Sequence, residues 1–245
     1  MKPAADFALA RSRLYKLLAV ALAAPEKGFF VALKDGFFLA ALREEITSVG
    51  LGDALETTGL ETVLDKADLP SRQAVIVQEY TNLFVHPGTP AQPYETEYTA
   101  AHPFMKSDQL ADLMGFYRAF GLDMSETDRD RPDSIVAELE FMHVLCLKEA
   151  AARAHYFGQI EMMEDAEKRF LGDHIGRWAG PFAQKVSESG ISPLYASLLL
   201  LVHEFTAAEC RRLGVVPDSP PGVSTDREEP GLCETPAAPL EEPIP

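Results

Sequence analysis

The stretch RPDSIVAELEFMHVLC, residues 131–146, indicates the fold class of this chain. Its large apolar residues recur at positions 135, 139, 142 and 146, which is the spacing of one face of an α-helix. Pro132 lies near the start of the pattern and Asp133 follows it, where a carboxylate favours the positive end of the helix dipole. The stretch therefore predicts an amphipathic helix that buries one face.

Helical patterns recur on both sides of this stretch, whereas strand patterns are weak. The segments with helical periodicity are residues 4–24, 28–48, 51–67, 71–85 and 106–120 upstream, and residues 159–190 and 192–213 downstream. Gly36 weakens the second segment, and Gly180-Pro181 is a possible break within residues 159–190. We predict one all-α domain of about 7 to 9 helices over residues 1–214.

Composition sets limits on the class of protein. The 245 residues include 22 Lys and Arg against 38 Asp and Glu, which gives a net charge of −16. Such acidity excludes a nucleic-acid binder, because phosphate contacts need a basic face. Three cysteines are too few and too scattered for a disulfide framework or a Cys-rich zinc site.

The C-terminal segment differs from the rest of the chain. Residues 215–245 hold 8 of the 18 prolines and 7 acidic residues against one basic residue. They contain few large apolar side chains, so they cannot bury enough surface to offset the entropy lost on ordering. We predict a disordered acidic tail over residues 215–245.

The N-terminal segment allows two interpretations. Arg11, Arg13 and Lys16 precede the apolar run LLAVALAA, residues 17–24, which resembles a signal peptide. Asp6 and the helical spacing of the leucines instead favour a core helix, which we expect. The chain has no run of 18 apolar residues that could span a membrane, so cytoplasm is the expected location.

Residues 86–98, HPGTPAQPYETEY, interrupt the helical pattern with prolines at positions 87, 90 and 93. Proline lacks a backbone donor and disfavours helix at the preceding residue, so this segment is expected to be an irregular, partly extended loop. Aromatic residues lie before and within it. They could form the wall of a groove for an apolar peptide, or they could simply cover the core.

Motifs for catalysis are incomplete. Glu140 and His143 have the Glu-x-x-His spacing of di-iron bundles, but the chain has no second such pair. His203-Glu204 begins a His-Glu-x-x-His pattern that fails because position 207 is Ala. Cys146 lies on the apolar face and is most simply a core residue. We therefore predict no catalytic residue, no metal site and no cofactor.

Two separated motifs resemble the TorD/DmsD/NarJ family of redox-enzyme maturation chaperones. The first spans residues 79–98 and combines EYTNLF, a proline-rich loop and PYETEY. It matches that family's aromatic-x-x-Leu-Phe segment, proline-rich loop and Ser/Thr-x-aromatic close. The second, RPDSIVAELEFM at residues 131–142, is similar to the family's Pro-Asp-His-x-x-x-Glu-Leu-x-Phe-Met signature. The match runs in order from about residue 7 to 213. One position departs from it, because Ser134 stands where the family has His and so lacks a titratable group.

The resemblance implies a TorD/DmsD-like all-α chaperone that acts in the cytoplasm and is not an enzyme. Its client would be the apo form of a molybdopterin oxidoreductase, bound through its twin-arginine leader, its body or both. The chaperone would hold the client for cofactor insertion before assembly or export. A monomer and a domain-swapped dimer are both compatible with the sequence. The alternatives are a helical adaptor without such a client and a metalloenzyme bundle.

A receptor for a twin-arginine leader needs acidic groups beside an apolar surface, because the leader is a basic patch followed by an apolar helix. The residues that we expect to bind it are Tyr80, Leu83, Phe84, Pro93, Tyr94, Tyr98, Asp133, Ser134 and Glu138. In this set Asp133 and Glu138 would supply charge. Leu83 and Phe84 could instead belong to the core, and Glu138 could instead accept hydrogen bonds from the loop backbone.

Overall fold

The computed structural model describes residues 4–65, 69–86, 88–100, 103–123, 131–155 and 159–218. In these residues the elements are α1 (Ala4–Leu22), α2 (Lys27–Lys34), α3 (Phe37–Ser48), α4 (Ala54–Thr57), α5 (Leu60–Asp65), α6 (Leu69–Tyr80), the π-helix η1 (Thr81–Val85), α7 (Thr96–Thr99), α8 (Pro103–Ala119), α9 (Ile135–His155), α10 (Ile160–Asp173), α11 (Ile175–Ser189) and α12 (Pro193–Leu213). The described residues form no β-strand, so the predicted all-α class is confirmed.

The structure has twelve α-helices in the described residues, more than the 7 to 9 expected, because predicted segments divide. Gly36 separates α2 from α3 with a φ of 74°, a left-handed conformation that glycine adopts without steric cost. The segment 159–190 divides at His174, and α11 continues through Pro181, so Gly180-Pro181 is not the break. The segment 71–85 begins at Leu69 and changes to a π-helix at Thr81.

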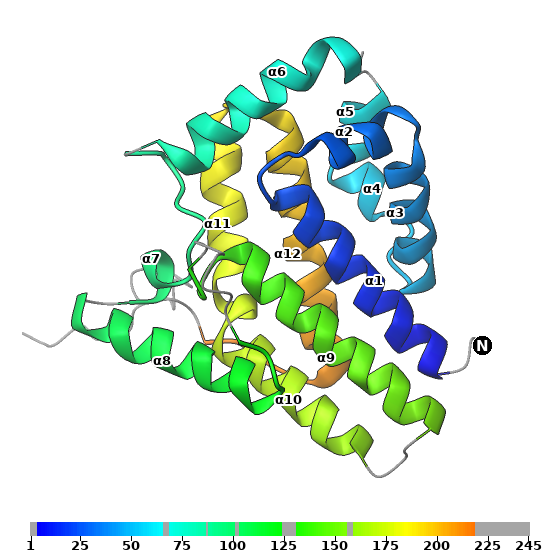
Figure 1. Ribbon diagram of the computed structural model, residues 1–245, viewed down its shortest axis with the longest axis vertical. Coiled ribbons are helices and arrows are strands. Elements are labelled where there is room, and N and C mark those ends of the chain that lie inside the picture. Colours follow the sequence, from blue (N-terminus) through cyan, green and yellow to red (C-terminus); the bar gives the residue numbers. More distant parts are fainter. Residues whose placement is uncertain are drawn as a thin grey trace, which may run out of the picture.

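Four long helices make the centre of the molecule. Helix α1 packs along α9, which runs in the opposite direction, and α11 packs along α12 (Figure 1). Helix α12 also contacts α1. The predicted apolar face of α9 is buried, since Ile135, Leu139, Met142 and Cys146 are at most 2% exposed. Leu14 is fully buried as well, so α1 is a core helix, as its periodicity predicted.

An ion-pair cluster with the fully buried Arg11 at its centre connects α1, α9, α10 and α12. The guanidinium of Arg11 in α1 binds Glu149 of α9 and Glu209 of α12 at 2.5 Å each, and it also binds Glu167 of α10. Arg212 donates to Glu167 and Glu209, and Arg153 donates to Glu149, so three guanidinium groups match three carboxylates. Burial raises the pKa of Glu167 to about 7, although Arg11 acts in the opposite direction.

Cysteine and carboxylate ligands also meet in this cluster. The Cys146 sulfur and carboxylate oxygens of Glu167 and Glu209 lie within 4.8 Å of one another. Because Arg11 already binds both carboxylates, their arrangement is explained by the guanidinium and needs no metal ion.

Replacing Arg11 with Met tests the contribution of this cluster. We expect a loss of about 3–5 kcal/mol in the free energy of unfolding, because the substitution leaves buried carboxylates without their partner. Urea unfolding followed by circular dichroism measures it. Arg13→Met is the matched control on the same helix. Arg13 is 55% exposed and 3.4 Å from the buried Glu45, so water screens the pair and we expect a loss of about 0–1 kcal/mol. If the two variants lost equal free energy of unfolding, the stabilising role of the Arg11 cluster would be contradicted.

Residues 215–218, which follow α12, remain in contact with the helical domain. The Val215 amide donates to the Cys210 carbonyl at 2.9 Å, and Val215 packs against the core. A Cβ atom at Gly176 would clash first with the Leu171 carbonyl oxygen and would lie 3.0 Å from Pro217, so Pro217 packs closely on the start of α11. The predicted tail thus overlaps described structure at residues 215–218, and its remainder, residues 219–245, lies outside the described residues.

Two truncations distinguish these parts of the tail. Ending the chain after residue 218 is expected to leave the free energy of unfolding unchanged, because the sequence predicts no core contact beyond it. Ending it after residue 214 is expected to cost about 1 kcal/mol, since the partly buried Val215 and Pro217 are removed. Thermal and urea unfolding of both shortened chains check this. A large loss on removing residues 219–245 alone would contradict the sequence-based view of the tail.

Candidate functional site

The proline-rich loop is held against the N-terminus of α9. Tyr94 and Ser134 form an isolated antiparallel bridge. Its backbone hydrogen bonds run from the Glu95 amide to the Asp133 carbonyl at 2.8 Å and from the Ile135 amide to the Pro93 carbonyl at 3.0 Å. Two motifs about 40 residues apart in the sequence are therefore one structural unit.

Hydrogen bonds of the Asp133 and Ser134 side chains stabilise this unit. Asp133 is fully buried and accepts hydrogen bonds from the Thr96 hydroxyl at 2.8 Å and from two nitrogens of Arg131 at 2.8 and 2.9 Å. Ser134 Oγ accepts from the Ala137 amide at 3.1 Å, which is an N-cap of α9. The residue that departs from the family pattern therefore caps the helix.

A second set of buried polar groups lies behind the loop. Glu138 is fully buried and accepts a hydrogen bond from the Trp178 indole at 3.0 Å. Burial, together with the charge of nearby Glu95, raises the pKa of Glu138 well above its usual value. Glu95 pairs with Nδ1 of His174 at 3.1 Å, which joins the loop to the start of α11. These groups join the loop, α9 and α11.

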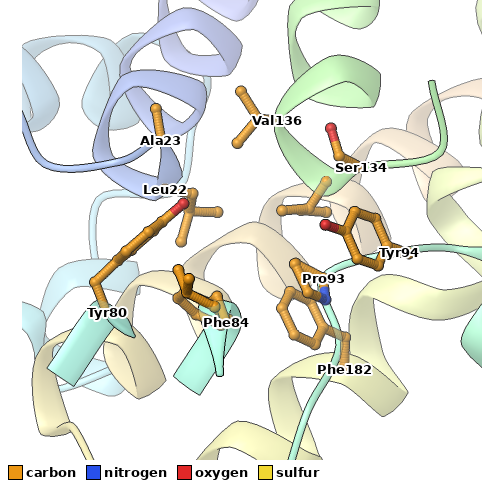
Figure 2. Close-up of a pocket in the computed structure, with 11 residues that line it drawn as sticks. Leu22, Ala23, Tyr80, Phe84, Pro93, Tyr94, Ser134, Val136 and Phe182 are labelled. Carbon is orange, nitrogen blue, oxygen red and sulfur yellow. The ribbon is translucent and has the colours of Figure 1, made fainter. Parts of the chain in front are cut away.

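A pocket of about 230 Å³, lined mainly by aliphatic and aromatic residues, lies beside the bridge (Figure 2). It is enclosed by the end of α1, the π-helix η1, the loop, the first turn of α9 and α11. Its lining residues are Leu22, Ala23, Tyr80, Phe84, Val85, Pro93, Tyr94, Ser134, Ile135, Val136 and Phe182. For brevity we call this the inner pocket.

Aromatic rings give the inner pocket its shape. The Tyr80 and Phe84 rings meet edge to face with centroids 5.2 Å apart, and Phe84 packs on Phe182 at 6.0 Å. The guanidinium of Arg131 covers one face of Tyr94 at 4.2 Å from the ring centroid. The π-helix, a rare element that often occurs at functional sites, contributes Phe84 and Val85 to the lining, and Val85 is 60% exposed.

The structure divides the nine predicted binding residues into two groups. Those that line the inner pocket are Tyr80, Phe84, Pro93, Tyr94 and Ser134. Those that are buried outside its lining are Leu83, Tyr98, Asp133 and Glu138. In this second group Tyr98 stacks on Trp178, and Glu138 bonds Trp178 rather than the loop backbone that the sequence had suggested as an alternative.

The sequence did not identify six residues that line the inner pocket. They are Leu22, Ala23, Val85, Ile135, Val136 and Phe182. Val85, Ile135 and Val136 are direct neighbours of the recognised motifs, so their proximity was a usable signal. The apolar run at residues 17–24 was visible, but nothing in the sequence placed its end beside the loop.

The side chains that line the inner pocket are suited to binding a partner through apolar contacts. Among its described lining residues there is no acid, base, cysteine or histidine, and the Ser134 hydroxyl already caps α9. Its volume is below the roughly 300–1,000 Å³ of typical small-molecule sites. It therefore suits one or two apolar side chains of a bound segment.

The fold and the pocket together define an all-helical protein with an apolar recess beside a tethered loop. The sequence matches the model of the nitrate reductase delta subunit family over residues 50–184, and the chain belongs to this family, which is of the NarJ/TorD type expected from the motifs. None of the described helices is both long and apolar enough to cross a membrane.

Three curated relatives are similar to this chain. A perchlorate reductase assembly chaperone protein of Dechloromonas aromatica is 26% identical over 213 residues, covering 85% of this chain and 92% of that protein. A selenate reductase assembly chaperone protein of Thauera selenatis is 34% identical over 105 residues, or 43% of this chain and 53% of the relative. A chlorate reductase assembly chaperone protein of Ideonella dechloratans is 32% identical over 108 residues, or 44% and 54%.

The raised pKa of Glu138 predicts a pH dependence of stability. Between its ordinary pKa and the raised value, the folded protein holds a proton that the unfolded chain has released. The contribution of Glu138 to the free energy of unfolding therefore falls as the pH rises through this interval. Gln does not titrate, so we expect Glu138→Gln to gain stability relative to the unsubstituted protein between pH 5 and pH 8.

Urea unfolding at several pH values measures this difference. Glu204→Gln, at an exposed position of α12, is the control and is expected to show no such trend. A Glu138→Gln variant that loses relative stability as the pH rises would mean that Glu138 is ionised and stabilised in the folded state.

Proposed function

We propose that this protein is a maturation chaperone for a molybdopterin-containing oxidoreductase. It binds the apo form of the catalytic subunit in the cytoplasm and keeps it competent for cofactor insertion before assembly or export. The family membership and the printed names of the relatives, all reductase assembly chaperones, support this class of function. In this proposal the protein acts by binding and catalyses no reaction.

The inner pocket carries the proposal. It brings together five of the residues that the motifs marked for partner binding, and its lining is suited to apolar side chains. Tyr80 and Tyr94 are half-buried on its walls, and aromatic residues of this kind often supply much of the energy of a protein interface. An exposed apolar segment of an unfinished client would bury its side chains there, at about 25 cal/mol per Å² of apolar area.

The buried acids have a different role in this proposal from the one that the sequence suggested. Asp133 and Glu138 are fully buried and hydrogen-bonded, so they are not placed to meet a basic leader directly. They hold the loop, α9 and α11 in the positions that form the pocket. Their substitution would therefore alter client binding through the shape of the pocket.

Tyr80→Ala tests the binding surface. We expect it to weaken binding of the apo catalytic subunit about 10- to 100-fold, because truncating an aromatic interface residue typically costs about 1.4–2.7 kcal/mol. Biolayer interferometry with purified protein and apo client measures the dissociation constant. The control is Val75→Ala, which removes an apolar side chain that is 46% exposed on the same helix and outside the pocket. Equal affinities of the two variants would exclude the inner pocket as the client site.

The identity of the client requires a second experiment. Tagged protein recovered from native cells is expected to carry the catalytic subunit of a molybdopterin oxidoreductase, identified by mass spectrometry, with less than stoichiometric molybdenum. The Tyr80→Ala variant is expected to recover much less of it. Recovery of a partner unrelated to oxidoreductases, equally dependent on Tyr80, would favour a helical adaptor instead. Binding of client chains with and without the leader then shows which part is bound.

A further inference from the structure

His174 occupies the single position between α10 and α11 and is only 2% exposed. Its amide donates to the Phe170 carbonyl at 3.1 Å, and its own carbonyl accepts from the Arg177 amide at 2.9 Å. The rings of Phe116 and Phe170 pack on the imidazole, with centroids 5.3 and 4.9 Å away. The backbone of both helices and the two rings therefore hold the imidazole in one place.

The imidazole ring lies between two carboxylates from different parts of the chain. Nδ1 is 3.1 Å from the carboxylate of Glu95, which is buried at the end of the proline-rich loop. Nε2 is buried and makes no hydrogen bond within the described residues, but it lies 3.5 Å from the carboxylate of Asp112 on α8. The Asp112 side chain is 64% exposed, so it is hydrated and free to turn toward the ring or away from it.

A neutral imidazole cannot donate to both carboxylates. It has one N–H donor and one lone pair, so in either tautomer one of the two carboxylates faces a lone pair. The doubly protonated ring donates from both nitrogens. Because Asp112 is exposed and only 3.5 Å away, a small movement of its side chain completes the second hydrogen bond. The two carboxylates therefore match the cationic form of His174.

Other ionisable groups surround this site on α9 and α10. Burial and the neighbouring Glu95 raise the pKa of Glu138 on α9, so Glu138 keeps its proton to higher pH than an ordinary glutamate and adds less negative charge. Asp165 and Arg169 of α10 line the same surface hollow as Asp112, and their opposite charges offset each other. The charges that face the ring directly are thus the two carboxylates on its two sides.

Helix α8 lies at the edge of the molecule (Figure 1) and contacts the segment before α9 through Tyr117. The Tyr117 hydroxyl donates to the Pro132 carbonyl at 2.6 Å. The next carbonyl, that of Asp133, accepts the hydrogen bond from the Glu95 amide that pairs this segment with the loop. An interaction that holds both α8 and Glu95 to the start of α11 therefore stabilises both partners of the pairing beside the inner pocket.

We infer that His174 is a proton-dependent latch, which closes when its ring binds Glu95 and Asp112 together. Imidazole is the side chain that changes charge at about pH 6.5, close to physiological pH. Protonation closes the latch because both nitrogens then donate, and loss of the proton releases Asp112 and with it α8. The closed latch strengthens client binding at the inner pocket. This last consequence rests on the proposed function, whereas the latch itself does not.

Hydrogen–deuterium exchange of the full-length protein at pH 6.0 and pH 8.0 measures the latch, after correction for the intrinsic effect of pH on exchange. We expect α8 to be about 5-fold better protected at pH 6.0. Long-range proton–nitrogen NMR spectra of the imidazole rings, assigned with His174→Gln, show at which pH His174 loses its second proton. The loss of protection is expected over the same interval.

Asp112→Asn assigns the effect to the latch. An amide can donate to the ring or accept from it at every pH, so we expect this variant to lose the pH dependence of α8 protection. Asp108→Asn, one turn earlier on α8 and also exposed, is the matched control and is expected to keep it. Glu138 is present in both variants, so its own titration cannot cause a difference between them.

Several results would overturn the latch. They are protection of α8 that does not change with pH, a change that survives in Asp112→Asn, and a His174 ring whose protonation is constant from pH 6.0 to pH 8.0. For client binding we expect an affinity about 5-fold higher at pH 6.0 than at pH 8.0, with no such difference in Asp112→Asn. An affinity of the unsubstituted protein that is independent of pH would overturn the regulatory consequence.

The two sets of measurements separate the latch from the proposed function. If α8 responds to pH as expected but Tyr80→Ala does not weaken client binding, the latch stands and the proposed use of the inner pocket is wrong. If client binding depends on Tyr80 but α8 is insensitive to pH, the proposed function stands and the latch is wrong.

Discussion

The pairing of residues 93–95 with residues 133–135 is the constraint on which the candidate site depends. Two backbone hydrogen bonds hold the loop in place, and the prolines of the loop prevent it from forming a regular helix. The fully buried Asp133 also accepts a hydrogen bond from the Thr96 hydroxyl, next to the loop. A buried carboxylate is stable only when it is paired and hydrogen-bonded, so Arg131 and Thr96 are required partners. Because the pairing places Pro93 and Tyr94 opposite the end of α1, the recess between them exists only while this contact holds.

Buried and exposed acids have separate uses in this molecule. Arg11 and its three glutamates bring α1, α9, α10 and α12 together, and Glu138 joins α9 to Trp178 of α11. The energy of such groups depends on exact hydrogen-bonding partners, which suits them to defining one arrangement of helices. Glu140 keeps its solvent exposure instead and pairs with the equally exposed Lys16. An exposed pair of this kind contributes little to stability, whereas the buried Asp133 depends on Arg131 and Thr96.

Much of the fold could be predicted from local patterns. The apolar spacing of α9 and the predicted helical segment 192–213, which is α12, both correspond to the structure, because such patterns arise from residues within one or two helical turns. The break between α10 and α11 was misplaced, since Pro181 is accommodated within α11. The aromatic and proline residues of the site were found through the motifs. The contribution of α1 and Phe182 was missed, because it depends on helices forty or more residues away from the motifs in the sequence.

The sequence by itself determined the helical class, the family and the positions of the two motifs, because periodicity and local spacing are properties of neighbouring residues. Only the tertiary structure decided which of the marked residues line the inner pocket and which are buried behind it. Asp133 and Glu138, the two acids that the sequence favoured for partner contact, are fully buried in the structure. Exposure and charge pairing arise when distant segments pack together, and no local pattern in the sequence records them.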